Sequence, residues 1–265
     1  MQQFPFWHKQ TPGTPLYPDI AWNKPEQRSQ AGKLGIIGGN KLGFAGVAES
    51  YSTSLTAGVG EVKVLLPEVL KKSIPPIITD AQFAPSNISG SLSRDALADM
   101  KALGAWAQGI LLIGDAGRSS ETAIVYDDFI REYHGQLTLT RDAIDLLQAS
   151  HGTLVEREHT LFVASFAQVQ KLFRSVYYPK MLTFSMQLLQ FVDALHKFTT
   201  SYPVTIATLH KDTLVMAHDG TVITMEWNSP LRIWRGHTAS VMAAYYLWNP
   251  SKPLEAIATS VSGER

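Results

Sequence analysis

The sequence contains no cysteine among its 265 residues. This absence excludes disulfide bonds, catalysis by a thiolate and zinc sites built on cysteine, and it fits a reducing cytoplasm. Eight histidines are present, but no two have the H-x-x-x-H or H-E-x-x-H spacing of a zinc site on a helix. We therefore expect no zinc centre and assign no metal ligands.

The chain also lacks an excess of charge, because 23 Lys and Arg residues balance 23 Asp and Glu residues. A neutral chain creates no overall field that attracts nucleic acid or an acidic membrane. The longest apolar run, GILLIG at residues 109–114, is far shorter than the roughly 20 residues that span a bilayer. The proline-interrupted start of the chain is typical of neither a signal peptide nor a membrane anchor. We expect a cytoplasmic protein whose partner is a small molecule or another protein.

Residues 1–31 are rich in proline and aromatic residues. Five prolines between Pro5 and Pro25 interrupt regular structure, so this segment is predicted to be an extended arm. Aromatic side chains such as Trp7 and Trp22 are costly to leave in water, so we expect the arm to pack on the body of its own or a neighbouring subunit. We take residues 32–265 as a single domain and expect a homo-oligomer.

From Lys33 onward, apolar runs alternate with amphipathic segments. Strands are predicted at 34–39, 62–67, 109–114, 137–140, 160–165 and 204–209, with a hairpin over 212–225 that turns at Asp219 and Gly220. Helices are predicted at 44–57, 92–107, 119–134, 181–199 and 238–248, with a short one from Pro253. In the fourth helix a stripe from Met181 through Phe184, Leu188 and Phe191 to Leu195 predicts a core face. The alternation predicts an α/β fold of three layers, with helices on both faces of a mostly parallel sheet.

Ligands bind such folds at the carboxyl ends of the parallel strands. The first stretch at a predicted strand end is GGNKLGFAG, residues 38–46. Its adjacent glycines let the backbone approach a ligand, and the free N–H groups of the following helix favour an anion. The spacing matches neither G-x-G-x-x-G nor a loop that ends in G-K-[ST]. The alternative is a tight turn whose glycines serve packing alone.

The stretch WRGHTAS, residues 234–240, precedes the last long helix. Gly236 supplies conformational freedom, Thr238 is a candidate cap, and the first-turn N–H groups with the charge of Arg235 predict an anion site. His237 is a candidate general base, since an ordinary imidazole titrates near neutral pH. The alternatives are a capped helix with a surface arginine and a histidine that only forms hydrogen bonds.

Two acidic residues also follow predicted strands: Asp115 after GILLIG and Asp142 after LTLT. Both are expected to face one cleft, where they are candidates to bind Mg²⁺. The alternative is that each carboxylate caps a helix for local reasons.

The ordered stretches resemble the ADP- or ATP-dependent NAD(P)H-hydrate dehydratases of the ribokinase-like superfamily, from about residue 33 to residue 255. GIIGGNKLGFAG is similar to the family's V-I-G-G-S-x-x-Y-x-G-A, which contacts substrate, and GVGEVKVLLPE to its G-A-G-x-V-x-V-x-x-P. GILLIGDAGRSSET lies where the family has G-P-G-L-G. LTLTRDAIDLL resembles D-A-D-A-L-N-L-L, with Asp142 kept and Asp145 at the family's Asn. The resemblance implies a ribokinase-like fold, ADP or ATP with Mg²⁺, and hydrated NAD(P)H as the substrate of a nucleotide-dependent dehydration.

The second half departs from the family where its chemistry lies. Ser165 stands where the family has His in T-P-H-P-G-E, and Leu209 replaces the Lys of L-K-G. The G-x-G-D motif aligns with GHTA, so Ala239 takes the position of the Asp that acts as base. Loss of a positioned base costs roughly 10²- to 10⁴-fold in rate.

Three functions remain open at this point: a dehydratase of hydrated NAD(P)H, a catalytically inactive homologue that binds a nucleotide or a protein, and a kinase for a small hydroxylated substrate. The candidate catalytic residues are His237 and Asp142. The candidate binding residues are Gly38, Gly39, Asn40, Gly43, Phe44, Gly114, Asp115, Asp142, Arg235, Gly236, His237 and Thr238.

Overall fold

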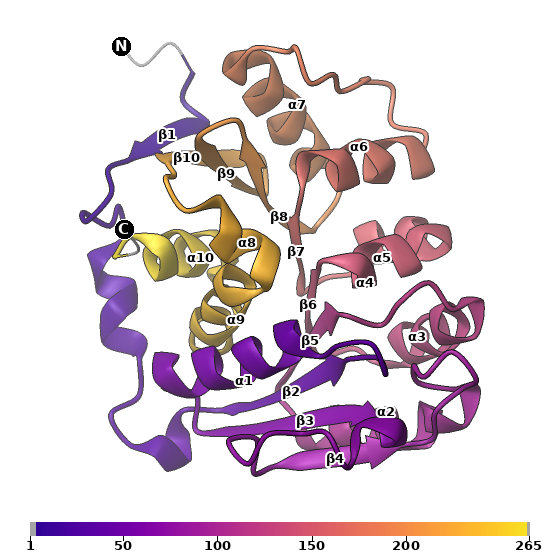
Figure 1. The fold of residues 1–265 in the computed structure, drawn as a ribbon. Coiled ribbons are helices and arrows are strands. Elements are labelled where there is room, and N and C mark those ends of the chain that lie inside the picture. Colours follow the sequence, from indigo (N-terminus) through magenta and orange to yellow (C-terminus); the bar gives the residue numbers. More distant parts are fainter. Residues whose placement is uncertain (1–3, 264–265) are drawn as a thin grey trace.

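A computed structural model of the chain describes residues 4–263. Its centre is a ten-stranded sheet with the order β1-β10-β9-β8-β7-β6-β5-β2-β3-β4 (Figure 1). All neighbouring strands pair in parallel except β9, which runs antiparallel to both β8 and β10. The strands are β1 (Trp7–Gln10), β2 (Lys33–Gly38), β3 (Glu61–Pro67), β4 (Ala81–Ala84), β5 (Gly109–Gly114), β6 (Gln136–Thr140), β7 (Thr160–Ala164), β8 (Thr205–His210), β9 (Thr213–His218) and β10 (Thr221–Glu226).

Helices cover both faces of the sheet, as Figure 1 shows. One layer contains α1 (Ala45–Ala57), α8 (Pro230–Arg235), α9 (His237–Trp248) and α10 (Pro253–Val261). The other contains α2 (Leu97–Trp106), α3 (Ser120–Glu132), α4 (Asp142–Leu146), α5 (His151–Glu156), α6 (Phe166–Ser175) and α7 (Leu188–Ser201). The prediction of a three-layer fold with a mostly parallel sheet is confirmed.

The central strands are apolar on both faces because each face carries helices. In β5, Ile110 and Leu112 pack toward one helix layer, and Leu111 and Ile113 pack toward the other. Successive side chains of a strand point to opposite faces, so an apolar run such as GILLIG contributes to both cores. The run therefore places the residue after Gly114 at the sheet's carboxyl edge.

The amino-terminal segment is more regular than predicted. Residues 7–10 form β1, which pairs in parallel with β10 and becomes one edge of the sheet. The short helical turns η1 (Pro18–Asn23) and η2 (Arg28–Gln30) follow it. The prolines lie outside the four-residue strand, so they do not prevent its pairing. This segment packs on its own chain, where the Trp7 indole N–H donates to Thr224 Oγ1 at 2.8 Å.

The predicted helix at 181–199 was wrong at its start, because α7 begins at Leu188. Met181 and Phe184 lie before the helix and are largely exposed, whereas Phe191 and Leu195 are buried as expected. The strands β1 and β4 and the helices α4, α5, α6 and α8 were not predicted from the sequence. Within residues 4–263, no helix is both long and apolar enough to cross a bilayer.

Candidate functional site

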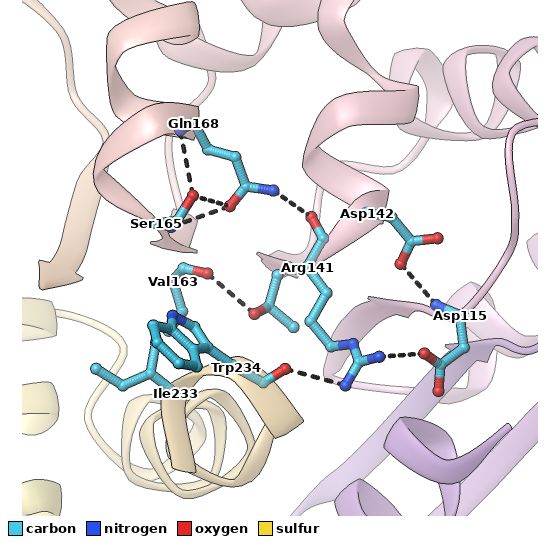
Figure 2. A pocket seen from close by; sticks show the side chains of 9 residues that line it. Asp115, Arg141, Asp142, Val163, Ser165, Gln168, Ile233 and Trp234 are labelled. Atoms are coloured by element: carbon cyan, nitrogen blue, oxygen red, sulfur yellow. Dashed lines mark hydrogen bonds and ion pairs between the residues drawn. The ribbon is translucent and has the colours of Figure 1, made fainter. Parts of the chain in front are cut away.

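A cavity of about 450 Å³ opens at the carboxyl ends of β5, β6 and β7 (Figure 2). Its lining comes from the ends of these strands and from helices on both sides of the sheet: Asp115, Thr140, Arg141, Asp142, Val163, Ser165, Gln168, Ile233 and Trp234. We call this cavity the edge pocket. Asp115 and Asp142, predicted to face one cleft, both line it.

Both carboxylate oxygens of Asp142 accept backbone hydrogen bonds from the loop after β5. The N–H of Asp115 donates to Oδ1 at 2.7 Å, and the N–H of Ala116 donates to Oδ2 at 3.1 Å. Gly114 must be a glycine here, because its φ is +87° and a Cβ would lie 2.0 Å from Asp142 Oδ1. Burial raises the pKa of Asp142 above its ordinary value and outweighs the opposing effect of these hydrogen bonds.

The carboxylate of Asp115 is also fully engaged. One oxygen forms an ion pair with the Arg141 guanidinium, and the other accepts the backbone N–H of Gly46 at 2.6 Å. Gly46 lies in the first turn of α1, so Asp115 supplies the anion that this helix N-terminus favours. The turn at residues 38–46 was predicted to hold an anion, and the protein's own side chain occupies one of its N–H groups.

Arg141 joins the end of β6 to helix α8. Its backbone has a φ of +55°, and its guanidinium donates to the carbonyl oxygen of Trp234 at 3.0 Å in addition to its contact with Asp115. The Nε atom is buried and has no hydrogen-bond partner among the described residues. The guanidinium therefore lies between the acidic side of the edge pocket and the helix that carries Trp234 (Figure 2).

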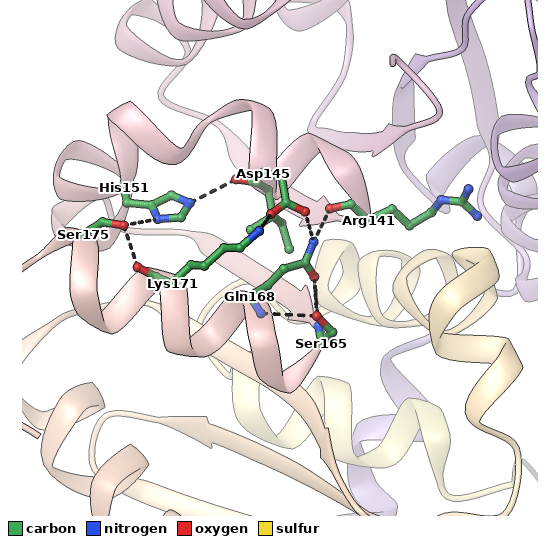
Figure 3. A network of polar contacts seen from close by, with 8 residues as sticks. Arg141, Asp145, His151, Ser165, Gln168, Lys171 and Ser175 are labelled. Carbon is green, nitrogen blue, oxygen red and sulfur yellow. Dashed lines mark hydrogen bonds and ion pairs between the residues drawn. The ribbon is translucent and has the colours of Figure 1, made fainter. Parts of the chain in front are cut away.

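A polar network supports the opposite wall of the edge pocket (Figure 3). The Gln168 amide donates to the Arg141 carbonyl at 2.7 Å and to Asp145 at 2.8 Å, while Lys171 pairs with the other oxygen of Asp145. Gln168 also completes a capping box with Ser165 at the start of α6. These contacts hold the wall in one arrangement, so the pocket is largely preformed.

Behind this wall lies His151, buried in α5. Its Nε2 lies 3.0 Å from the Ile144 carbonyl and its Nδ1 lies 3.0 Å from the hydroxyl of Ser175. Burial lowers the pKa of His151 below its ordinary value, so the neutral ring is favoured.

The predicted turn residues after β2 lie beside the edge pocket. Asn40 and Gly43 line an adjacent cavity of about 260 Å³, and Asp115 borders both cavities. The Gly39 N–H donates to the Gly114 carbonyl at 2.9 Å, which ties this turn to the loop after β5. A Cβ at residue 38 would lie 2.3 Å from that carbonyl oxygen and 2.8 Å from Ile113, so Gly38 serves close packing, and Phe44 packs on the core of the α1 layer.

The turn at residues 235–238 follows Trp234 but does not line the edge pocket. Gly236, with a φ of +92°, links α8 directly to α9, and a Cβ there would meet Ile113 at 2.3 Å. Thr238 makes no capping hydrogen bond, and its hydroxyl is buried. His237 Nδ1 lies 3.2 Å from the Thr53 hydroxyl and lines a different cavity, so the structure does not bring it to Asp142. Arg235 is exposed, and no residue from 235 to 238 lines the edge pocket.

The edge pocket offers the carboxylates of Asp115 and Asp142 but, within residues 4–263, no preformed cage of three or more side chains for a resident Mg²⁺ ion. Proteins usually bind Mg²⁺ through one or two carboxylates together with waters and substrate phosphates. Every carboxylate oxygen of Asp115 and Asp142 already accepts a hydrogen bond. Within residues 4–263, no group of three or more His, Asp or Glu side chains is placed to hold a metal.

Sequence reasoning did not select Arg141, Gln168 or Trp234. Arg141 lies between the predicted strand LTLT and the candidate residue Asp142, and this position at a strand end is the signal that could have identified it. Trp234 begins the stretch at residues 234–240 that the sequence singled out, but only residues 235–238 of that stretch were selected as binding candidates.

The sequence matches no family profile and no curated protein. Solved structures do match the fold. A ribokinase-like superfamily protein of Enterococcus faecalis is 14% identical, with a TM-score of 0.73 over 99% of this chain and 88% of that one. A protein of Streptococcus mutans is 13% identical, with a TM-score of 0.69 over 91% and 84%. The ADP/ATP-dependent NAD(P)H-hydrate dehydratase of Bacillus subtilis, crystallised with ATP and Mg²⁺ and soaked with CoA, is 10% identical, with a TM-score of 0.61 over 93% and 86%.

The chain therefore has the ribokinase-like fold. The resemblance to the hydrate dehydratases seen in the sequence is confirmed at this level, with a structure of that enzyme among the neighbours.

Proposed function

We propose that this protein binds a nucleotide in the edge pocket and does not convert it chemically. The observation that carries the proposal is the pairing of Trp234 and Arg141 in one preformed cavity at the carboxyl edge. Trp234 is 52% exposed, so its ring is available to stack on a flat heterocycle. The guanidinium of Arg141, which already pairs with Asp115, is the cationic group in the lining that an anionic group of the ligand would contact. A volume near 450 Å³ lies in the range of small-molecule sites.

The absence of turnover is supported by the state of the acidic groups. Ala239, at the position of the dehydratase base, is fully buried in α9. Asp142 is the nearest replacement, but a carboxylate that accepts two backbone N–H groups is held in a structural role. A base must be within hydrogen-bond reach of the proton that it removes.

A thermal-shift titration tests the binding. NADH, NADPH, ADP and ATP are titrated separately into the wild-type chain, and a ligand that binds only the folded state raises the unfolding temperature. Stacking on an aromatic side chain contributes about 1–3 kcal/mol, so Trp234→Ala should weaken the Kd roughly 5- to 150-fold. The matched control is Trp22→Ala, since Trp22 is 84% exposed and lies outside the pocket. No shift with any nucleotide, or equal shifts in both variants, contradicts the proposal.

The second candidate function is dehydration of hydrated NAD(P)H with ADP or ATP and Mg²⁺. It is favoured by the fold shared with the Bacillus subtilis enzyme. The test is recovery of NADH absorbance from NADH hydrate, Mg²⁺ and ATP or ADP. Recovery above a protein-free control that is lost in an Asp142→Asn variant would establish this activity, and recovery at the control rate supports binding alone.

A cytoplasmic location and assembly into a homo-oligomer belong to the same proposal. The location rests on the composition of the chain, and sedimentation velocity of the purified protein tests the assembly.

A further inference from the structure

A second cavity, of about 360 Å³, lies between α1, α9 and the residues that follow η1. It shares no lining residue with the edge pocket. We call it the helix-layer pocket. Thr53 and Thr56 of α1 face His237 and Tyr245 of α9 across it, and Lys24 closes one side.

The charge of this pocket is positive. Lys24 has no ion pair with a carboxylate among the described residues, and its ammonium lies 5.7 Å from the ring centre of Trp248. No Asp or Glu of residues 4–263 belongs to the lining. An ammonium without a counter-ion beside a cavity favours an anionic group there.

Hydroxyl groups also line the pocket. Ser52, Thr56 and Tyr245 have side-chain hydroxyls that form no hydrogen bond within the described part of the chain. Ser52 and Thr56 are four residues apart on α1 and so lie on one face of the helix. The Tyr245 ring packs against Trp248 with ring centres 5.2 Å apart. Burial raises the pKa of Tyr245, so its hydroxyl remains a donor at neutral pH.

We propose that the helix-layer pocket is a second ligand site, for a small hydroxylated molecule that carries a phosphate or carboxylate group. The Lys24 ammonium contacts the anionic group, and the hydroxyls of Ser52, Thr56 and Tyr245 bond to the hydroxylated carbon skeleton. The pocket volume admits a ligand of a few carbon atoms beside the anionic group. This site is independent of nucleotide binding at the carboxyl edge.

Calorimetric titration of the full chain tests the proposal. The probes are inorganic phosphate, glycerol 3-phosphate and glycerate, with sodium chloride at the same ionic strength as the control. We expect saturable binding of glycerol 3-phosphate or glycerate, and the stronger of the two identifies the anionic group. A hydrogen bond to a charged group contributes enough that Lys24→Gln should weaken this binding about tenfold or more.

Three further variants locate the site. Thr56→Trp fills the pocket from an exposed position and should abolish binding. Lys63→Gln removes another lysine whose ammonium lies over a tryptophan ring, 4.2 Å from Trp106, and should change nothing. Trp234→Ala alters the edge pocket alone and should leave this binding intact. The proposal is overturned if none of the three probes binds saturably, or if binding is the same in Lys24→Gln and Thr56→Trp as in the wild type.

Discussion

The carboxylate of Asp142 holds the loop after β5, and its removal should destabilise the fold. Asp142→Ala deletes two hydrogen bonds, from the N–H groups of Asp115 and Ala116. Each N–H group left without an acceptor costs about 1–3 kcal/mol, and relief of the burial that raises the pKa of Asp142 offsets part of this cost, so we expect a loss of about 3 kcal/mol in the free energy of unfolding. In a chain of this size, that loss corresponds to a decrease of roughly 6–12 °C in Tm.

Urea unfolding followed by tryptophan fluorescence and far-UV circular dichroism measures this loss. Asp142→Asn keeps one side-chain oxygen as an acceptor and should lose about half as much. Asp95→Ala, at an exposed aspartate, should change the free energy of unfolding by less than about 0.5 kcal/mol. If Asp142→Ala loses less than about 1 kcal/mol, the carboxylate does not hold the loop and is available for other chemistry.

Three further predictions concern other buried positions of the fold. Burial lowers the pKa of His151, so the unfolded chain binds a proton that the folded chain excludes. Below about pH 6.5, this residue should therefore reduce the free energy of unfolding by up to about 1.4 kcal/mol per pH unit. His151→Gln should weaken the pH dependence of the urea midpoint measured from pH 5 to 8. Gly39→Ala should lower the free energy of unfolding, measured in urea, by about 1–3 kcal/mol, because φ is +92° and a Cβ would lie 2.9 Å from Leu66. Gly43→Ala, where a Cβ would meet open space, should lower it by less than about 1 kcal/mol. Ala239→Asp should lower Tm without producing turnover of NADH hydrate, because it places an unpaired carboxylate in a fully buried position; faster turnover would contradict this.

The central fold could be predicted because its elements have local signals. The β2–α1–β3 unit has an apolar strand, an ordinary helix length and glycine at its C-cap, where Gly58 has a φ of +108°. β1 was missed because four residues between prolines carry little periodic signal, and their pairing partner β10 lies more than 200 residues away. The start of α7 was misplaced because Met181 and Phe184 continue the helical spacing although they lie outside the helix.

The candidate site was predictable only in part. Strand ends located Asp115 and Asp142, because carboxyl ends of parallel strands meet at one edge. Their hydrogen bonds depend on Gly114 and Arg141, both with positive φ, and backbone geometry of this kind is not visible in residue spacing. The separation of His237 from Asp142 follows from α8, an unpredicted helix that runs directly into α9.

The account's central claim is that the edge pocket binds a nucleotide beside Trp234 and Arg141. A crystal structure of the protein grown with NADH or ATP tests it most directly. We predict density for a heterocyclic ring against the Trp234 indole and for an anionic group near the Arg141 guanidinium. Density for the nucleotide in the helix-layer pocket alone, or at another surface of the molecule, would contradict the claim.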